Sequence, residues 1–353
     1  MDNTRKDRYG EEVLMRKREI IAETADLAIG YRMRSRVNHV MKHLSLQACQ
    51  GELVALIGRN GTGKSTLLRT LVGLQPALGG TIKLQGKDLQ SIGSSLLPRI
   101  VSFASTEPVA VRNIKVRDVV ALGRFPFTNW IGTLSAEDEE AVSEALEATG
   151  LTMLAGRSID NISDGERQRT LIARSLAQDT GLLVMDEPTA FLDLPSRFSI
   201  VSLLRQLTRE HNKCVIYSTH DLDTAINEAD RIWLMTGEGI AGGAPEDLIL
   251  TGTVARAFES PLLSFSSSEG TFSFIRGMQT GIALEGTGLA ARLTEKALSR
   301  CGYRTDPQAA IKVQVRETPD GPEWIVVNGN QTDRCRSLYD LVSILPGDAG
   351  QLP

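Results

Sequence analysis

The segment LIGRNGTGKST, residues 56–66, places glycines, a lysine and hydroxyl groups directly after an apolar run. Its spacing fits the pattern G-x-x-x-x-G-K-[ST], in which glycines let backbone amides turn toward phosphate oxygens. In that pattern the amides surround the α- and β-phosphates of a nucleotide, Lys64 meets the β- and γ-phosphates, and Ser65 supplies an oxygen to Mg²⁺. The residues of this loop are Gly58, Asn60, Gly61, Thr62, Gly63, Lys64, Ser65 and Thr66. The alternative is a glycine turn that binds nothing.

Two adjacent carboxylates, Asp186 and Glu187, follow the apolar run LLVM at 182–185. Ligands of open α/β sheets bind at the carboxyl ends of the strands. We therefore expect Asp186 to hold Mg²⁺, usually through water, and Glu187 to act as the general base on an attacking water. His220 follows the run CVIYST at 214–219, where a neutral imidazole would contact the γ-phosphate and that water. The alternatives are a solvated acidic turn and an ordinary polar strand cap.

A third polar cluster lies in the segment NISDGERQRTLIARSLAQ, residues 161–178. Ser163 and Glu166 have the S-x-x-E spacing of a capping box, so a helix is expected to begin there. Leu171 and Ile172 contribute to an apolar face on that helix. On these residues alone, a plain capped helix is the alternative to a binding role.

Strands and helices must hold these positions. The run ELVALIG before the glycine loop is continuously apolar, which predicts a buried strand, and STLLRTLVG after it has helical spacing. The runs at 182–185 and 214–219 are also followed by helical periodicity, so we expect a parallel sheet covered on both faces. The segment 135–150 predicts a helical insertion, with Ser135 as its N-cap and Gly150 as its stop.

The chain is expected to divide into three parts. Residues 1–19 form a polar extension, 20–278 carry all three polar clusters with a helical part at about 96–180, and 279–353 form a small α/β domain. In the small domain we expect a helix at LAARLTEKALSRCG, strands at AIKVQVRE and EWIVVNG joined by a PDGP turn, and a closing helix at SLYDLVSIL. The serine- and glycine-rich segment 260–277 predicts an edge hairpin or a linker.

Composition limits the class of protein. With 353 residues, 41% of them hydrophobic and 23% charged, the chain has an ordinary soluble globular composition. Its net charge of −4 gives no general attraction to nucleic acid, and no apolar run approaches the length of a membrane span. The N-terminal segment alternates charges, so we expect no secretory signal. The four cysteines show no paired spacing, so neither a zinc site nor a disulfide framework is expected.

Taken in order, the phosphate loop, ISDGERQR, LLVMDEPT, FLD and THD resemble the nucleotide-binding subunit of an ATP-binding-cassette (ABC) transporter. The resemblance covers about 20–278. It implies an α/β fold of the phosphate-loop NTPase class, with a RecA-like parallel sheet core, an antiparallel β subdomain and a helical insertion. It also implies ATP and Mg²⁺ as cofactors, ATP hydrolysis coupled to transport, and His220 as the family's switch histidine.

Further roles follow from the resemblance and not from spacing. Tyr31 matches the aromatic residue that stacks on adenine. Ser163 and Gly165, with Glu166 beside them, match the signature that contacts the γ-phosphate of ATP bound to the other subunit. Asp193 matches the residue that links the two sites across the dimer. The implied partner is therefore a second copy of the chain, with ATP shared between the two.

Within the family, the segment VRDVVALGRFPF, residues 116–127, resembles the helical region of importers for iron siderophores, haem and cobalamin. The implied partners are transmembrane permease subunits and, through them, a substrate-binding protein, with the chain peripheral at the cytoplasmic face of the membrane. Phe125, Phe127 and Trp130 are candidates for lining the groove that receives the permease, and core packing is the alternative. The cargo is chosen by the other subunits and is not given by this sequence.

The chain departs from the family pattern in three places. Thr106 and Glu107 stand where a glutamine is usual, and threonine reaches roughly 2.5 Å less far, so a water or Glu107 must replace the glutamine's contact with Mg²⁺. The signature carries Asp164 instead of glycine and Glu166 instead of glutamine. A carboxylate about 7 Å from the γ-phosphate would add repulsion of about 2 kcal/mol at an effective dielectric near 20, so we expect Asp164 to point to solvent. The domain after 279 has no counterpart in the simplest family members.

Two other functions stay open. A soluble ABC protein acting on nucleic acid or ribosomes usually has two cassettes or a long coiled-coil insertion, and this sequence shows neither. An ATP-gated dimerisation module with little hydrolysis is suggested by Thr106 and Asp164, but the intact Glu187 and His220 argue against it. No nucleic acid partner is expected.

Overall fold

The structure is a computed structural model that describes residues 18–33, 36–105, 113–129, 132–258, 260–261, 263–266, 270–274 and 280–346. The chain forms two compact units. The first holds the residues up to Phe258 together with Ser267–Thr271, and the second holds Glu259–Ser266 together with the chain from Phe272 onward.

The first unit is built around a six-stranded sheet. Five strands run parallel, and β11 pairs antiparallel at one edge. In spatial order the strands are β11 (Ile240–Gly243), β10 (Arg231–Met235), β4 (Leu53–Gly58), β9 (Cys214–Thr219), β8 (Leu182–Asp186) and β7 (Val101–Ser105). β4, β8 and β9 are buried along their whole length, which is typical of a parallel sheet covered on both faces. The predicted parallel core is confirmed.

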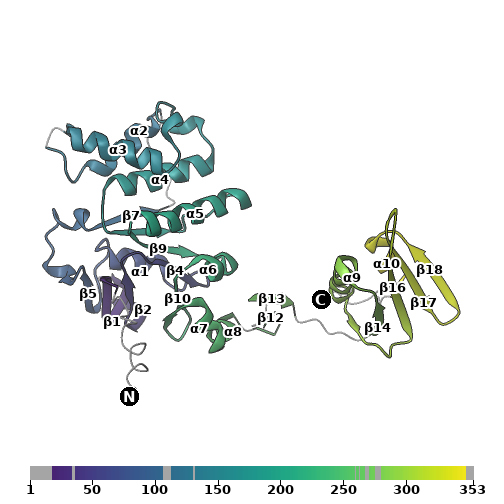
Figure 1. Ribbon diagram of the computed structural model, residues 1–353. Coiled ribbons are helices and arrows are strands. Elements are labelled where there is room, and N and C mark those ends of the chain that lie inside the picture. Colours follow the sequence, from purple (N-terminus) through teal and green to yellow (C-terminus); the bar gives the residue numbers. More distant parts are fainter. Residues whose placement is uncertain are drawn as a thin grey trace, which may run out of the picture. The chain divides into compact units, whose positions relative to one another are not determined.

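Helices cover both faces of this sheet (Figure 1). On one face the leucines of α1 (Lys64–Leu71) pack against Val54 and Leu56 of β4. On the other, α5 (Leu194–Glu210) and α6 (Leu222–Glu228) contact β4. Two short helices follow β11, namely α7 (Pro245–Leu250) and α8 (Thr253–Phe258). The sheet therefore holds α1 and α5 at fixed positions around the strand ends.

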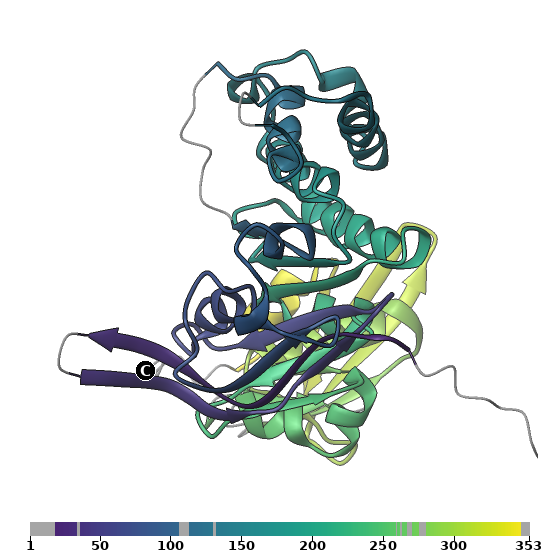
Figure 2. The ribbon, with the colours of Figure 1, turned by 90° about the vertical axis from the view of Figure 1, so that its left-hand side faces the viewer.

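An antiparallel sheet packs on α1. Its strands in spatial order are β2 (Arg36–Leu44), β1 (Ile20–Met33), β5 (Gly79–Leu84) and β6 (Lys87–Asp88), with β3 (Gln47–Cys49) paired to β1. Leu27 and Leu84 belong to the same core cluster as Leu67 and Leu71 of α1. Figure 2 shows β1 and β2 as a long two-stranded ribbon. The expected antiparallel subdomain is thus present, and it holds α1 against the parallel sheet.

Three helices form a separate layer (Figure 2). They are α2 (Val116–Ala121), α3 (Ala136–Ala148) and α4 (Asp164–Ala177). Val119 and Val142 are fully buried in the core that these helices share. The helix predicted at 135–150 is confirmed, because Ser135 caps it through a capping box and Gly150, with φ of +69°, follows its last turn.

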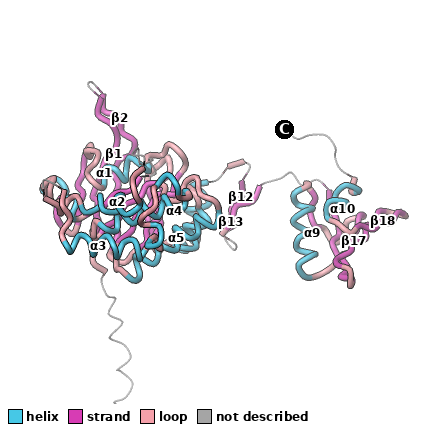
Figure 3. Tube along the Cα trace, turned by 90° about the horizontal axis from the view of Figure 1, so that it is seen from above, coloured by secondary structure: helices cyan, strands magenta, loops and turns pink. Residues whose placement is uncertain are grey.

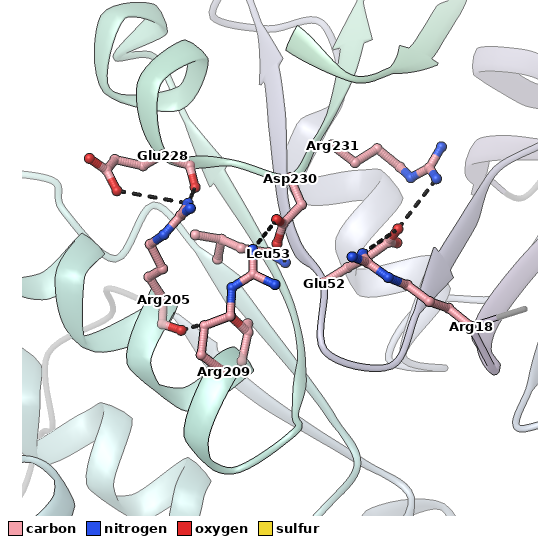
Figure 4. Close-up of polar contacts among 9 residues, drawn as sticks. Arg18, Glu52, Leu53, Arg205, Arg209, Glu228, Asp230 and Arg231 are labelled. Carbon is pink, nitrogen blue, oxygen red and sulfur yellow. Dashed lines mark hydrogen bonds and ion pairs between the residues drawn. The ribbon is translucent and has the colours of Figure 1, made fainter. Parts of the chain in front are cut away.

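Charged side chains fix the amino end of β4, opposite the glycine loop (Figure 4). Glu52 is only 5% exposed, and its carboxylate lies 3.4 Å from the guanidinium groups of both Arg18 and Arg231. The backbone N–H of Leu53 donates to the carboxylate of Asp230 at 2.9 Å. These contacts join the segment before β1, the start of β4 and the start of β10.

The second unit contains a five-stranded sheet and two helices. In spatial order the strands are β15 (Tyr303–Thr305), β14 (Thr280–Glu285), β16 (Ile311–Thr318), β17 (Gly321–Asn328) and β18 (Gln331–Cys335). Figure 3 shows α9 (Gly288–Arg300) and α10 (Leu338–Ile344) beside this sheet, and both helices share one apolar core with it. In that core the indole N–H of Trp324 donates to Thr294 Oγ1 at 2.7 Å.

The helices and strands predicted for the C-terminal part are confirmed as α9, β16, β17 and α10. The segment predicted as a hairpin or linker contains the two-stranded pair β12 (Leu263–Ser266) and β13 (Thr271–Phe274). Strands β14, β15 and β18 were not predicted, because they are short or carry mixed polar residues. Within the described ranges, no helix combines the length and apolar character needed to cross a bilayer.

Candidate functional site

The glycine loop lies between the carboxyl end of β4 and the amino end of α1. Gly63 precedes the helix with φ of +105°, and no side chain caps the first turn. The amides of that turn are therefore open to an anion at the positive end of the helix dipole. A Cβ on Gly63 would lie 2.3 Å from Val40 Cγ1, so the position admits only glycine.

Lys64 folds back over this loop. Its ammonium donates to the carbonyl oxygen of Gly58 at 2.9 Å and lies 3.4 Å from that of Arg59. The residue is only 6% exposed. Burial lowers the pKa of the Lys64 ammonium, and the carboxylates of Glu187 and Asp186 oppose that shift. The ammonium is thus buried at the loop, and the charges of both carboxylates act on it.

Asp186 and Glu187 lie at the carboxyl end of β8 and share a contact with Ser218 of β9. Ser218 Oγ donates to Asp186 Oδ1 at 2.7 Å and accepts from the N–H of Glu187 at 2.8 Å. Asp186 is 8% exposed and Ser218 is fully buried. Glu187 has φ of +52°, in the left-handed region that is uncommon for residues other than glycine. The turn after β8 is therefore tied to a single buried hydroxyl.

His220 and Asp193 lie in the connections that follow β9 and β8. His220 is exposed immediately after the last residue of β9. Asp193 caps α5, and its carboxylate accepts from the N–H of Ser196 at 2.9 Å. The hydrogen bonds to Ser196 lower the pKa of Asp193. Both residues thus belong to the same edge of the sheet as Glu187.

Strand β1 places Tyr31 beside α1. The hydroxyl of Tyr31 lies 2.9 Å from Oγ1 of Thr66 in the first turn of that helix. Thr66 is 5% exposed, whereas Tyr31 is 48% exposed. An aromatic ring that is anchored by its polar end and open on its face is suited to stacking on a base.

Ser163 and Glu166 form the predicted capping box at the start of α4. Glu166 Oε2 accepts from the N–H of Ser163 at 2.8 Å and from its hydroxyl at 2.9 Å, and these bonds lower the pKa of Glu166. Gly165 lies against α5, since a Cβ there would be 3.1 Å from Ser196 Oγ. The structure thereby brings Gly165 next to the helix that Asp193 caps.

Asp164 also lies at this helix start. Its side chain is 75% exposed and pairs with Arg167 at 3.0 Å. In the single chain it faces solvent, and its orientation in an ATP-bound dimer stays a prediction. Thr106, Glu107 and Trp130, which the sequence also singled out, lie outside the described residues.

The chemistry of these groups suits Mg²⁺ and a nucleotide. Ser65, on the exposed side of α1, offers a hydroxyl oxygen, and Asp186 offers a carboxylate oxygen. Oxygen atoms of these types, together with phosphate oxygens, are the ligands that Mg²⁺ prefers. The open amides of α1 and the ammonium of Lys64 match phosphate charge.

Comparison with known proteins agrees with this chemistry. Residues 41–190 match the model of the ABC transporter family, and residues 279–346 match the iron ABC transporter C-terminal domain. The achromobactin transport ATP-binding protein CbrD of Dickeya dadantii is 38% identical over 234 residues, which cover 66% of this chain and 86% of that protein. The chain belongs to the ABC transporter ATP-binding proteins.

Two further ABC proteins illustrate the similarity. The ferric enterobactin transport ATP-binding protein FepC of Escherichia coli is 38% identical over 224 residues, covering 62% of this chain and 81% of FepC. The solved structure of cbiO1 from Clostridium perfringens, part of the ABC transporter complex cbiONQ, has a TM-score of 0.59 at 26% identity, covering 67% of this chain and 94% of cbiO1. The expected cassette fold and the ATPase class are therefore confirmed.

Ser218 contacts Asp186 and Glu187, and the sequence analysis did not single it out. It was included in the apolar run at 214–219 and given no role. A signal was available, because a small polar residue inside a fully buried strand needs a hydrogen-bond partner. Its partners became visible only with the pairing of β8 and β9.

Proposed function

We propose that this ABC ATPase binds ATP with Mg²⁺ at the carboxyl ends of β4, β8 and β9. The ring of Tyr31 stacks on adenine, the loop 58–66 surrounds the phosphates, and Lys64 neutralises charge on the β- and γ-phosphates. Ser65 and Asp186 hold Mg²⁺, which withdraws charge from the phosphate oxygens when bound. The observation that supports the proposal is the buried ammonium of Lys64 at the open first turn of α1, where the carboxylates of Asp186 and Glu187 act to raise its pKa.

Glu187 acts as the general base in this proposal. Its carboxylate takes a proton from the water that attacks the γ-phosphorus, and the bond from that phosphorus to the β–γ bridging oxygen breaks to give ADP and phosphate. His220, from the end of the neighbouring strand, contacts the water and the γ-phosphate. The half-buried position of Glu187 at the end of β8 is compatible with both solvent access and a fixed direction of attack.

The proposal requires a second copy of the chain. Ser163, Gly165 and Glu166 begin α4 in the helical layer, whereas the glycine loop begins α1 on the parallel sheet (Figure 1). The signature of one copy contacts the γ-phosphate held by the other copy, and Asp193 joins the two sites. ATP then closes the dimer, and hydrolysis reopens it.

The physiological role that we propose is import of an iron-siderophore, haem or cobalamin type of cargo. The match of residues 279–346 to an iron transporter C-terminal domain supports the iron class, as do relatives named for achromobactin and ferric enterobactin transport. The chain would sit at the cytoplasmic face of the membrane, bound to permease subunits and through them to a substrate-binding protein. Phe125, which is 73% exposed after α2, is a candidate contact for the permease.

Uptake of radioactive iron chelate by cells that lack this gene tests the cargo. Re-expression of the parent chain should restore uptake, and a Glu187→Gln variant should not. Restored uptake of cobalamin with no change in iron uptake would replace the iron assignment. If neither cargo responds while the purified chain hydrolyses ATP, the importer role is wrong and the ATPase assignment stands.

A further inference from the structure

Ser218 contacts the two residues on which hydrolysis depends in the proposed function. We propose that Ser218 is a positioning residue, whose hydroxyl orients the carboxylate of Asp186 and fixes the backbone of Glu187. The inference rests on the proposed roles of Asp186 and Glu187. The motifs that identify the phosphate loop, the signature and the carboxylates do not include this serine.

The register of the sheet places Ser218 at this point. β8 and β9 are parallel, and Met185 lies opposite Tyr217. The next step along both strands brings Asp186 opposite Ser218. Because side chains alternate along a strand, both residues share the face of Val184, which packs in the cluster that includes α1. The serine is therefore on the same side of the sheet as the start of the phosphate-loop helix.

The two hydrogen bonds of Ser218 fix the direction of its hydroxyl proton. A serine hydroxyl has one proton to donate and two lone pairs. An ionised carboxylate only accepts, and a backbone N–H only donates, so the proton goes to Asp186 Oδ1 and a lone pair accepts the N–H of Glu187. Asp186 Oδ1 is thus held by the protein, and its second oxygen is left for the metal's water shell.

The second contact acts on Glu187. Its φ of +52° lies in a region that side-chain-bearing residues rarely occupy. The bond from its N–H to Ser218 at 2.8 Å holds that conformation at the residue that carries the base. Without the acceptor, the N–H is left unsatisfied and the backbone is free to move toward an extended conformation. The carboxylate of Glu187 would then leave the direction in which the water attacks.

The test compares substitutions that differ only in the hydroxyl. Ser218→Thr and Ser218→Val have the same shape, and Ser218→Ala removes the hydroxyl without adding atoms. Ser102→Ala is the matched control, because Ser102 is 1% exposed in β7 and its Oγ has no hydrogen-bond partner among the described residues. The measurements are kcat and KM for ATP, the Mg²⁺ concentration for half-maximal rate, and binding of a fluorescent ATP analogue in Mg²⁺ and in EDTA.

We expect Ser218→Ala and Ser218→Val to lower kcat about 10–100-fold and to raise the Mg²⁺ requirement, as removal of a residue supporting a metal ligand does. Nucleotide binding in EDTA should match the parent, since the glycine loop is untouched. Ser218→Thr should recover most of the rate, and Ser102→Ala should match the parent throughout. If the added methyl unfolds the threonine variant, the two alanine variants decide.

Three results would overturn the inference. The first is an equal rate for the valine and threonine variants, and the second is an unchanged kcat and Mg²⁺ requirement in Ser218→Ala. The third is a loss of nucleotide binding in EDTA equal to the loss in Mg²⁺, which indicates general distortion of the site. A Glu187→Gln variant measured in parallel distinguishes failure of this inference from failure of the proposed ATPase mechanism. If that variant keeps the parent rate, the proposed base is wrong. If Glu187→Gln has no ATPase activity while Ser218→Ala has the rate of the parent, only the proposed role of Ser218 is wrong.

Discussion

The hydroxyl of Tyr31 and Oγ1 of Thr66 lie 2.9 Å apart and connect the antiparallel sheet to the first turn of α1. Thr66 is a buried residue of α1, so the contact holds the polar end of the tyrosine in a fixed place. The ring itself remains about half exposed beside the glycine loop. In the proposed function, this hydrogen bond links the residue that stacks on adenine to the helix that begins at the phosphate loop.

Removing the ring should weaken ATP binding. A base stacked on an aromatic side chain contributes about 1–3 kcal/mol, so Tyr31→Ala should raise the Kd for ATP by about 5- to 150-fold. Tyr31→Phe keeps the ring and loses only the contact with Thr66, so its effect should be no more than a few-fold. Calorimetric titration with ATP measures both. An alanine variant that binds ATP as tightly as the parent would remove Tyr31 from the site.

Replacing the base should separate hydrolysis from dimerisation. Glu187→Gln keeps the size of the side chain and removes its proton acceptor, so we expect steady-state ATPase to fall about 10²–10⁴-fold. Light scattering in ATP should still show a dimer, because the amide does not disturb the phosphate loop. Glu238→Gln, at an exposed loop position, is the control and should match the parent. A Glu187→Gln variant that stays monomeric in ATP would contradict the separation.

The sequence predicted the fold where burial and periodicity agree. β4 is a continuous apolar run, β9 begins with one, and the helix at 136–148 has both a cap and a stop, so their bounds were predicted closely. β18, with the sequence QTDRC, carries polar residues along an edge, and propensity alone gives no signal there. Its existence depends on pairing with β17, which is a tertiary contact.

Individual site residues were predictable, but their relationships were not. Motif spacing identified Lys64, Asp186 and Glu187, whereas the contact of Gly165 with Ser196 depends on how α4 packs on α5. The positive φ of Glu187 could not be predicted either, because nothing in DEPT distinguishes a left-handed residue from an extended one. Such contacts join segments that are distant in sequence, so local patterns do not encode them.

Breaking the buried pair of Arg124 and Asp138 should destabilise the helical layer. Arg124 Nε lies 2.8 Å from Asp138 Oδ1, with side chains 9% and 4% exposed. Removing one partner leaves the other charge buried without its counterion, so Asp138→Ala should lower the free energy of unfolding by about 3–5 kcal/mol. Glu139 lies on the same helix as Asp138 and forms a half-exposed pair with Arg117 of α2, so Glu139→Ala should cost less than about 1 kcal/mol. Urea unfolding at neutral pH compares the two.

The same pair predicts a pH dependence. Burial alone would raise the pKa of Asp138, but hydrogen bonds from Ser135 and Arg124 bring it below its ordinary value. A carboxyl whose pKa is lower in the folded state stabilises the fold above its unfolded pKa, near 4, and that stabilisation is lost as the pH falls through the folded pKa. The free energy of unfolding of the parent should therefore decrease more as the pH falls below about 4 than that of Asp138→Asn. If the free energy of unfolding depends equally on pH in both proteins, other groups cause the acid sensitivity.

Restoring the family's glutamine should raise turnover. The sequence has Thr106 at that position, and loss of a contact that supports a metal typically costs about 10–100-fold in affinity or activity. Thr106→Gln should therefore lower the Mg²⁺ concentration needed for half-maximal ATPase and raise kcat. Glu107→Gln tests whether the next residue already fills the role, in which case it should lower the rate. If neither variant changes the Mg²⁺ requirement, a water already makes the contact.

Glu166 should oppose closure of the ATP-bound dimer. Its carboxylate accepts from both the N–H and the hydroxyl of Ser163, so that hydroxyl must leave Glu166 before it can donate to a γ-phosphate. Glu166→Gln keeps an oxygen to cap the helix and removes the charge. At about 7 Å and an effective dielectric near 20, like-charge repulsion of about 2 kcal/mol corresponds to up to about 30-fold in affinity.

The variant should therefore dimerise at about 3–30-fold lower ATP concentration than its parent, measured by light scattering in a Glu187→Gln background that prevents turnover. Asp164→Asn is the matched control, because the Asp164 side chain is exposed and paired with Arg167, and it should change the ATP requirement little. A larger effect at Asp164 than at Glu166 would mean that Asp164 turns toward the phosphate on closure. High salt should reduce the effect of Glu166→Gln on the ATP requirement for dimerisation only slightly, because salt screens charges poorly inside a closed interface.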